Sequence, residues 1–223
     1  MQIREIEIVR FSIPIFPFVI STGTMHHAQN TLIRIYTDER TVGTGECSAF
    51  PMITGETQST CFEMAKDFAA IWKGKEALDI ETRMQELHQY ADFNGTIKSA
   101  FDMALYDIAA KVADKPLYAY LGGSSNEMET DLTIGIGEPE EMAAIAKGFV
   151  NRGVNIIKIK LGKNATTDIE RVKHIRMAVG DNIRLRIDAN QGWDFDSALY
   201  ALKAMGEYDV QFCEQPMRTW LDH

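Results

Sequence analysis

The sequence is poor in features that would narrow its function at once. Its three cysteines, Cys47, Cys61 and Cys213, are too few and too far apart for a disulfide framework or a zinc site, so a reducing, cytoplasmic location is expected. Basic charge is also scarce: 23 Lys and Arg against 32 Asp and Glu give a net charge of −9. We therefore expect no nucleic-acid partner, because phosphate binding needs a concentrated basic surface.

Long apolar runs are missing as well. The most apolar stretch, residues 13–20, is short and contains Pro14 and Pro17, so it cannot span a bilayer. Residues 1–11 carry charged side chains where a signal peptide would have its apolar region. We therefore expect neither a membrane span nor a secretory leader. The 45% hydrophobic and 25% charged content is ordinary for a globular protein.

The N-terminal half shows strand patterns followed by helix patterns. Alternating apolar residues predict a strand over about 6–13 and a hairpin formed by 31–37 and 41–46, whereas 17–30 are rich in Ser, Thr and Gly and are expected to form a loop. Helical spacing then predicts three helices, one capped by Thr60 and ending near Trp72, one over Asp79–Ala91 and one over Thr96–Val112. This order indicates an α+β domain, which we assign to residues 1–125.

From residue 126 onwards the pattern alternates between strand and helix. Predicted strands are centred on Ile134, Ile159, Ile187 and Cys213 and recur roughly every 26 residues, with helices between them at 140–151, 167–179 and 196–205. Such a repeat is typical of β/α units with a parallel sheet, here over residues 126–223. A doubly wound sheet and part of a (β/α)8 barrel both fit. No G-x-G-x-x-G motif follows a strand, which disfavours a dinucleotide-binding sheet.

One predicted strand carries two lysines. Side chains alternate between the faces of a strand, so Lys158 and Lys160 share one face and Ile159 lies on the other. Two neighbouring, partly buried ammonium groups are expected to have lowered pKa values, which would let one act as a base. The alternative is an exposed edge strand that lysines protect from pairing.

The next two strands end in carboxylates. Asp188 and Asn190 lie on one face at the end of the third strand, and Glu214 comes at the end of the fourth. Because the carboxyl ends of parallel strands form the active-site edge, these side chains are expected to face the lysines. Carboxylate oxygens of Asp188 and Glu214 suit Mg²⁺. Salt bridges would explain any one pair, but explain less well why all of them lie at the same end.

These motifs, KIKLG, LRIDANQGW and FCEQP in this order, resemble the enolase superfamily in its muconate-lactonizing subgroup. Within that subgroup, GECSAFPMITGET is most similar to the dipeptide epimerases, typified by those acting on L-Ala-D/L-Glu. The resemblance covers nearly the whole chain. It implies an α/β protein with an N-terminal α+β capping domain, followed by the first half of a modified TIM (β/α)7β barrel with four of its strands.

The resemblance also implies an isomerase that epimerises a small dipeptide with the help of Mg²⁺. Lys160 would remove or return the α-proton, and Lys158 beside it would help to hold the substrate carboxylate. Asp188 and Glu214 would be two of three Mg²⁺ ligands. Further substrate contacts are expected from Thr133 and Asn190, and from Ile53 and Thr54 in the capping segment 48–57, which would close over the site with residues 15–29.

Part of the family's site lies beyond this chain. The third metal ligand, the lysine on the opposite face and an Asp-x-Asp that binds the dipeptide ammonium come from later strands of the barrel. The resemblance therefore implies a C-terminally truncated relative, or one whose barrel a partner completes, and a homo-oligomer is expected. Other reactions of the superfamily remain open, namely cycloisomerisation, o-succinylbenzoate synthesis and N-acylamino acid racemisation, as does a non-catalytic half-barrel.

Overall fold

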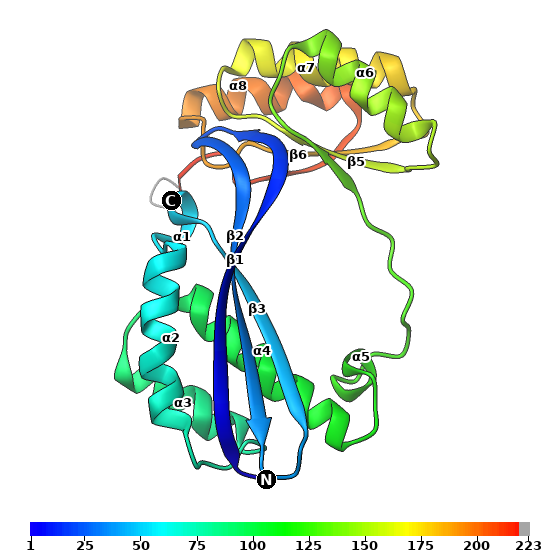
Figure 1. The fold of residues 1–223 in the computed structure, drawn as a ribbon. Coiled ribbons are helices and arrows are strands. Elements are labelled where there is room, and N and C mark those ends of the chain that lie inside the picture. Colours follow the sequence, from blue (N-terminus) through cyan, green and yellow to red (C-terminus); the bar gives the residue numbers. More distant parts are fainter. Residues whose placement is uncertain (219–223) are drawn as a thin grey trace. The chain divides into compact units, whose positions relative to one another are not determined.

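A computed structural model describes residues 1–218 of the chain, which form two compact units (Figure 1). The first unit contains residues 1–15 and 27–128, and the second contains residues 16–26 and the described residues from 129 onwards. A short piece of the N-terminal region therefore belongs to the second unit. The division into domains at residue 125 stays a prediction.

The first unit is built on a three-stranded sheet in the order β1 (Ile3–Ile20), β2 (Gly23–Thr37) and β3 (Val42–Ala49). The expected loop over residues 17–30 is wrong, because β1 and β2 continue through most of it and turn at Ser21 and Thr22. Pro14 and Pro17 lie in β1, which is an edge strand, and there a missing N–H need not cost a ladder hydrogen bond.

Five helices complete the first unit, namely α1 (Pro51–Thr54), α2 (Gln58–Trp72), α3 (Ile80–Tyr90), α4 (Gly95–Val112) and α5 (Leu117–Tyr120). The cap of α2 is Thr57 and not Thr60; Thr57 accepts a hydrogen bond from the backbone of Thr60 in a capping box. Phe68, Trp72 and Phe101 are fully buried, and the ring of Phe101 lies edge-on to the other two at 5.6 and 5.1 Å.

Strand β3 packs against α4 through its backbone. A Cβ atom on Gly45 would lie 1.9 Å from the carbonyl oxygen of Ala100, and one on Gly43 would lie 2.1 Å from that of Ala104. The two glycines therefore let the strand and the helix approach more closely than any side chain would allow. This unit encloses its own apolar core.

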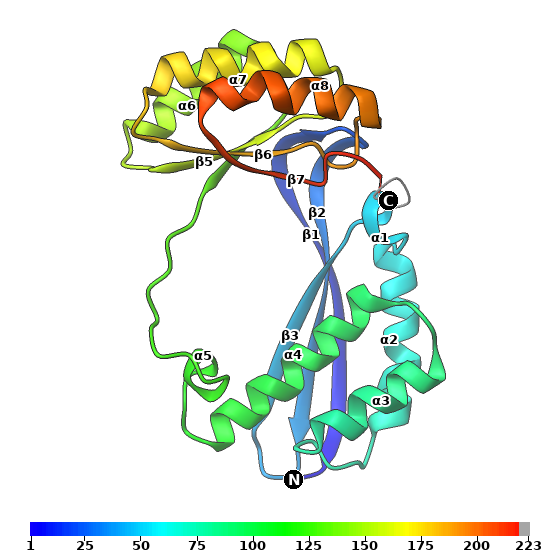
Figure 2. The ribbon, with the colours of Figure 1, turned by 180° about the vertical axis from the view of Figure 1, so that it is seen from behind.

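The second unit holds a parallel sheet in the order β4 (Leu132–Ile134), β5 (Ile156–Lys160), β6 (Arg184–Asp188) and β7 (Val210–Glu214). Its connections contain α6 (Pro139–Val150), α7 (Ala165–Val179), α8 (Phe195–Met205) and the 3-10 helix η1 (Gly206–Tyr208). Helices α6, α7 and α8 cover one face of the sheet (Figure 2). The predicted fold class, an α+β unit followed by part of a parallel α/β barrel, is confirmed.

The two faces of this sheet differ in chemistry. Ile157, Ile159, Leu185 and Ile187 are fully buried in the core that the helices form with the sheet. Thr133, Lys158 and Arg186 come at the alternate positions and are in register across β4, β5 and β6. The apolar face thus anchors the strands, while the other face carries polar side chains.

Within residues 1–218, every helix is too short or too polar to cross a membrane.

Candidate active site

The lysine pair lies at the carboxyl end of β5. Its neighbours Ile157 and Ile159 are fully buried on the helix side, which fixes Lys158 and Lys160 on the opposite face. Parallel pairing then places Lys160 beside Asp188, the last residue of β6. Asp188 is in turn paired with Glu214, the last residue of β7. Strand register therefore brings the predicted residues together.

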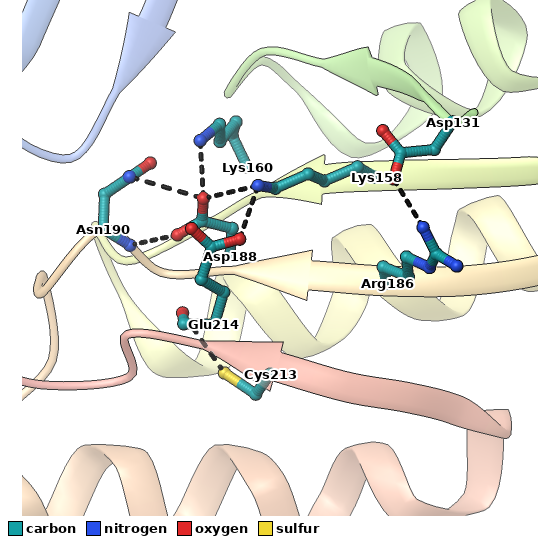
Figure 3. Close-up of polar contacts among 8 residues, drawn as sticks. All are labelled: Asp131, Lys158, Lys160, Arg186, Asp188, Asn190, Cys213 and Glu214. Carbon is teal, nitrogen blue, oxygen red and sulfur yellow. Dashed lines mark hydrogen bonds and ion pairs between the residues drawn. The ribbon is translucent and has the colours of Figure 1, made fainter. Parts of the chain in front are cut away.

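Both lysines contact the same carboxylate (Figure 3). The Nζ of Lys160 donates a hydrogen bond of 2.6 Å to Oδ2 of Asp188, and the Nζ of Lys158 lies 3.1 Å from that oxygen. Lys158 also donates to Oε2 of Glu214 at 2.6 Å. The ammonium group of Lys158 thus joins the two carboxylates, whereas Lys160 contacts Asp188 alone among them.

Contacts between opposite charges lower the pKa of Asp188 and raise the pKa of Lys158. Burial favours the neutral acid of Asp188, but hydrogen bonds from Lys160 and from the backbone N–H of Asn190 hold its pKa below the usual range. Burial likewise favours neutral Lys158, but hydrogen bonds to Glu214 and Asp188 raise its pKa. The expectation that Lys158 has a lowered pKa is therefore wrong for this arrangement, because hydrogen bonds to two carboxylates favour its charged form.

The chain turns sharply after Asp188 and after Glu214. Asn190 and Gln215 both have left-handed backbones, with φ of 45° and 43°. Such angles are uncommon for residues other than glycine and cluster at functional sites. The turn lets the backbone N–H of Asn190 donate to Oδ1 of Asp188 at 2.9 Å, and its Nδ2 lies 3.4 Å from Oδ2. Both carboxylate oxygens of Asp188 are therefore held by neighbours.

The other predicted substrate contacts fall in two places. Thr133 is partly exposed and pairs with Lys158 across β4 and β5, and Asn190 lies beside Asp188. Ile53 and Thr54 are exposed residues of α1 in the first unit, where Thr54 donates a hydrogen bond to the carbonyl of Phe50. Ile53 and Thr54 belong to a different unit from the lysines, and their contact with substrate stays a prediction.

Residues 16–26, the tip of the hairpin formed by β1 and β2, contact the site residues. Residues 15–29 were expected to close over the site, but as a loop and not as strands. The ring of Phe18 lies 5.8 Å from Nζ of Lys160, and Ser21 donates a 2.7 Å hydrogen bond to the carbonyl of Asn190. The carbonyl of Val19 accepts from the backbone N–H of Ile136, just beyond β4. The alternating Phe16, Phe18 and Ile20 could have indicated a strand here, although the residues that follow are rich in Ser, Thr and Gly.

Cys213 precedes Glu214 but is not a reactive nucleophile. Burial, with the charge of Asp188 nearby, raises the pKa of the Cys213 thiol to about 12. The thiol is therefore protonated at neutral pH, and its sulfur lies 3.8 Å from the carbonyl oxygen of Glu214.

The carboxylate pair fits part of a Mg²⁺ site. Asp188 and Glu214 end adjacent strands in register, and Lys158 already places a positive charge against both. Within residues 1–218 no three His, Cys, Asp or Glu side chains gather as a metal-binding group. Mg²⁺ is often held by only one or two carboxylates, with water and substrate oxygens as the other ligands. The donor set thus suits this ion without completing its shell.

Comparison with known proteins agrees with this geometry. Residues 3–122 match the model of the mandelate racemase/muconate lactonizing enzyme N-terminal domain, and residues 141–223 match the enolase C-terminal domain-like model. The chain belongs to the mandelate racemase/muconate lactonizing enzyme family. Membership of the enolase superfamily, expected from three short motifs, is thereby confirmed.

Several curated relatives of this family member are named as dipeptide epimerases. A D-Ala-D/L-Ala epimerase from Cytophaga hutchinsonii is 42% identical over 219 residues, which are 97% of this chain and 60% of the relative. An L-Ala-D/L-Glu epimerase from Bacillus subtilis is 35% identical, with 97% of this chain and 61% of the relative covered. The chain spans about 60% of the length of the curated relatives that it matches.

Solved structures show the same likeness. The Cytophaga hutchinsonii dipeptide epimerase, in complex with Mg and the dipeptide D-Ala-L-Val, has a TM-score of 0.96 and 41% identity, covering 98% of this chain and 60% of that chain. A dipeptide epimerase from Enterococcus faecalis, in complex with Mg and L-Leu-L-Tyr, has a TM-score of 0.95 and 37% identity, covering 98% of this chain and 62% of that chain.

Proposed function

We propose that this chain carries one side of the active site of a Mg²⁺-dependent dipeptide epimerase, acting on substrates such as L-Ala-D/L-Glu. The observation that supports this most is the shared contact of Lys158 and Lys160 with Asp188, beside Glu214, at one edge of a parallel sheet. Relatives with Mg and a dipeptide in their crystal structures support the same choice of substrate and ion.

Each residue has a distinct task in the proposed reaction. Neutral Lys160 would take the α-proton of the substrate from one face, and its protonated form would return a proton to that face. Mg²⁺ held by Asp188 and Glu214 would supply positive charge beside the substrate carboxylate, onto which negative charge moves as the proton leaves. Lys158 is protonated and reaches both carboxylates, so it can also turn to a substrate carboxylate as a point charge.

The surrounding residues would position the dipeptide. Thr133 is level with Lys158 on the neighbouring strand, and Asn190 lies two residues after the proposed metal ligand Asp188, so both offer polar groups at the same edge. We include Ile53 and Thr54 as capping residues that contact the substrate. The ring of Phe18 beside Lys160 would keep water from the base.

Proton exchange with solvent tests the proposal. The protein is incubated with L-Ala-L-Glu or D-Ala-L-Ala in ²H₂O, with Mg²⁺ or with EDTA, and ²H at the α-carbon is followed by NMR. We expect Mg²⁺-dependent exchange that falls by on the order of 10²-fold or more in Lys160→Ala. The matched control is Lys163→Ala, which removes an exposed lysine just after the same strand and should leave the rate unchanged.

The stereochemistry provides a second check. Because Lys160 serves one face of the α-carbon, the chain should exchange the proton of one enantiomer without full epimerisation. Equal exchange from both enantiomers, or an unchanged rate in Lys160→Ala, contradicts the proposed roles. A folded protein that exchanges neither dipeptide contradicts the proposal for this chain. Exchange confined to an N-acylamino acid would instead favour another reaction of the family, such as that of the 32% identical N-succinyl-L-Arg/Lys racemase from Bacillus cereus.

A further inference from the structure

A second buried carboxylate lies behind the edge that carries the lysines. Asp168, in the first turn of α7, is fully buried. Its Oδ2 accepts hydrogen bonds from the backbone N–H of Gly162 at 3.0 Å and from the indole Nε1 of Trp193 at 2.9 Å. The backbone N–H of Asn164 lies 3.3 Å from the same oxygen. One carboxylate therefore joins the segments that follow β5 and β6.

Arg171 extends this connection to β4. Its Nη1 donates to Oδ1 of Asp168 at 2.7 Å, and its Nε donates to the carbonyl of Gly137 at 2.8 Å. The Arg171 side chain is 8% exposed, so the ion pair is shielded from water and from salt. Trp193 continues the connection, since its backbone N–H donates to the carbonyl of Pro216, just beyond β7.

The joined segments begin at the proposed site residues. Gly162 comes two positions after Lys160, and Trp193 comes three positions after Asn190. A Cβ atom on Gly162 would lie 2.1 Å from the carbonyl oxygen of Ala189, and one on Gly192 would lie 2.1 Å from that of Gly162. The two segments thus touch backbone to backbone, and the side chain of Ser21 lies against both glycines. The hydrogen bonds from Gly162 and Trp193 to Asp168 fix the distance between the two segments.

The surroundings of Asp168 suit a side chain that only accepts hydrogen bonds. Every partner of Asp168 is a donor: two backbone N–H groups, an indole and a guanidinium. An ionised carboxylate has enough lone pairs for all four, whereas an asparagine of the same shape would turn an NH₂ group towards one of the donors. Removing one partner of a buried, hydrogen-bonded set leaves the others unsatisfied.

We infer that Asp168, together with Arg171, is a positioning residue of the active site, which fixes the ends of β4, β5 and β6 so that Lys160 stays within hydrogen-bond distance of Asp188. Asp168 acts through the hydrogen bonds that it accepts from Gly162 and Trp193, whereas the ammonium group of Lys160 is bonded to Asp188. The consequence for catalysis rests on the proposed function, while the consequence for the position of Lys160 does not.

The test is Asp168→Asn, with Asp196→Asn as the matched control, because Asp196 is an exposed aspartate in the first turn of α8. Lysine reactivity is measured by brief acetylation and mass spectrometry, with Lys163 in the same molecule as the reference. We expect the ratio of Lys160 to Lys163 acetylation to rise several-fold in Asp168→Asn and to stay unchanged in Asp196→Asn. In the exchange assay, kcat should fall on the order of 10²-fold at nearly constant KM, as expected for a displaced base.

Two further variants keep the inference testable if Asp168→Asn does not fold. Arg171→Lys keeps the charge but cannot hold Asp168 and Gly137 in the same fork, and Trp193→Phe keeps the ring but removes one donor. Each should raise Lys160 acetylation by less than Asp168→Asn would.

The outcomes separate the two claims. Unchanged Lys160 reactivity in folded Asp168→Asn overturns the inference, as do unchanged reactivities in both milder variants where Asp168→Asn does not fold. A wild-type protein that shows no exchange, together with raised Lys160 reactivity in Asp168→Asn, contradicts the proposed function but supports the positioning role.

Discussion

Asp168 and Asp188 are equally well buried, but their surroundings differ in kind. Asp168 is bonded to backbone N–H groups, an indole and a guanidinium, all held by packing or by the chain itself. Asp188 has two lysine ammonium groups as partners, each at the end of a flexible side chain, in addition to Asn190. Asp168 therefore holds chain segments in place, whereas Asp188 is bonded to ammonium groups that a ligand can replace.

The comparison shows how a site can be both firm and adaptable. The segments that carry Lys160 and Asp188 are fixed by contacts that no ligand needs to disturb, such as the approach of Gly162 to Ala189. The polar side chains themselves contact one another through ammonium groups that a substrate or a cation can replace. Three sets of substitutions probe this difference, from the largest expected effect to the smallest.

Gly162→Ala disturbs the close backbone contact between the segments that follow β5 and β6. Gly162 has φ of +102°, and a Cβ atom there would lie 2.1 Å from the carbonyl oxygen of Ala189. Backbone strain and overpacking together should lower the free energy of unfolding by about 4 kcal/mol. Urea denaturation followed by circular dichroism measures the loss.

The control for this substitution is Gly148→Ala. Gly148 lies in α6, and a Cβ atom there would meet nothing within 4 Å. Alanine is the better helix former, so this variant should be more stable than the wild type by about 0.5–1 kcal/mol. Similar changes in both variants would show that the close approach after β5 does not matter.

Lys160→Met and Lys158→Met compare the two exchangeable partners of Asp188. The Lys160 side chain is 11% exposed and paired with a carboxylate that is 1% exposed, so its loss should cost about 2 kcal/mol of unfolding free energy. Lys158 is more exposed and contacts the half-exposed Glu214, so its loss should cost about 1 kcal/mol or less. Thermal and urea unfolding of both variants provide the values. A larger loss of unfolding free energy in Lys158→Met than in Lys160→Met would contradict this ranking of the two ion pairs.

Glu86 offers a third kind of carboxylate, partly exposed and far from the parallel sheet in sequence. Burial alone would raise its pKa, but hydrogen bonds from Arg83 and Lys75 lower it. A lowered pKa means that Glu86 stabilises the fold above its unfolded-state pKa of about 4, and that this contribution is lost as pH falls through the folded pKa.

Glu86→Gln should therefore cost about 1 kcal/mol or less at pH 7 and nothing in acid. Urea unfolding of the wild type and the variant across this pH range measures the difference. Glu81→Gln, which changes an exposed glutamate of the same helix, is the control and should have no effect at either pH. A cost that persists unchanged in acid would mean that Glu86 acts through packing rather than charge.

Much of the C-terminal unit could be predicted because its signals are local. Buried isoleucines alternate with lysines on β5, and the helices expected over 140–151, 167–179 and 196–205 agree with α6, α7 and α8 to within a residue or two. Once parallel order was expected, the polar residues Asp188 and Glu214 had to lie near Lys160, since each ends its strand.

Features that depend on distant partners could not be predicted. Residues 16–20 and 23–26 continue the strands of a hairpin that contacts Ile136 and Asn190, whereas their Ser, Thr and Gly content suggested a loop. Asp168 looks like an ordinary helix-start residue, and its partners Gly162 and Trp193 are identified only by the fold. The direction of the pKa shift of Lys158 depends on which carboxylates lie within hydrogen-bond distance, which spacing alone does not determine.

One titration can test the central claim. According to it, Asp188 belongs to a site that can bind a cation, whereas Asp168 only holds chain segments in place. Millimolar Mg²⁺ is added to ¹⁵N-labelled protein, and the backbone amide of Asn190 and the indole N–H of Trp193 are followed by NMR. These two N–H groups donate to Asp188 and Asp168 respectively. We predict a saturable shift of the Asn190 amide and an unchanged Trp193 indole. No shift at Asn190, or equal shifts at both, would contradict the account.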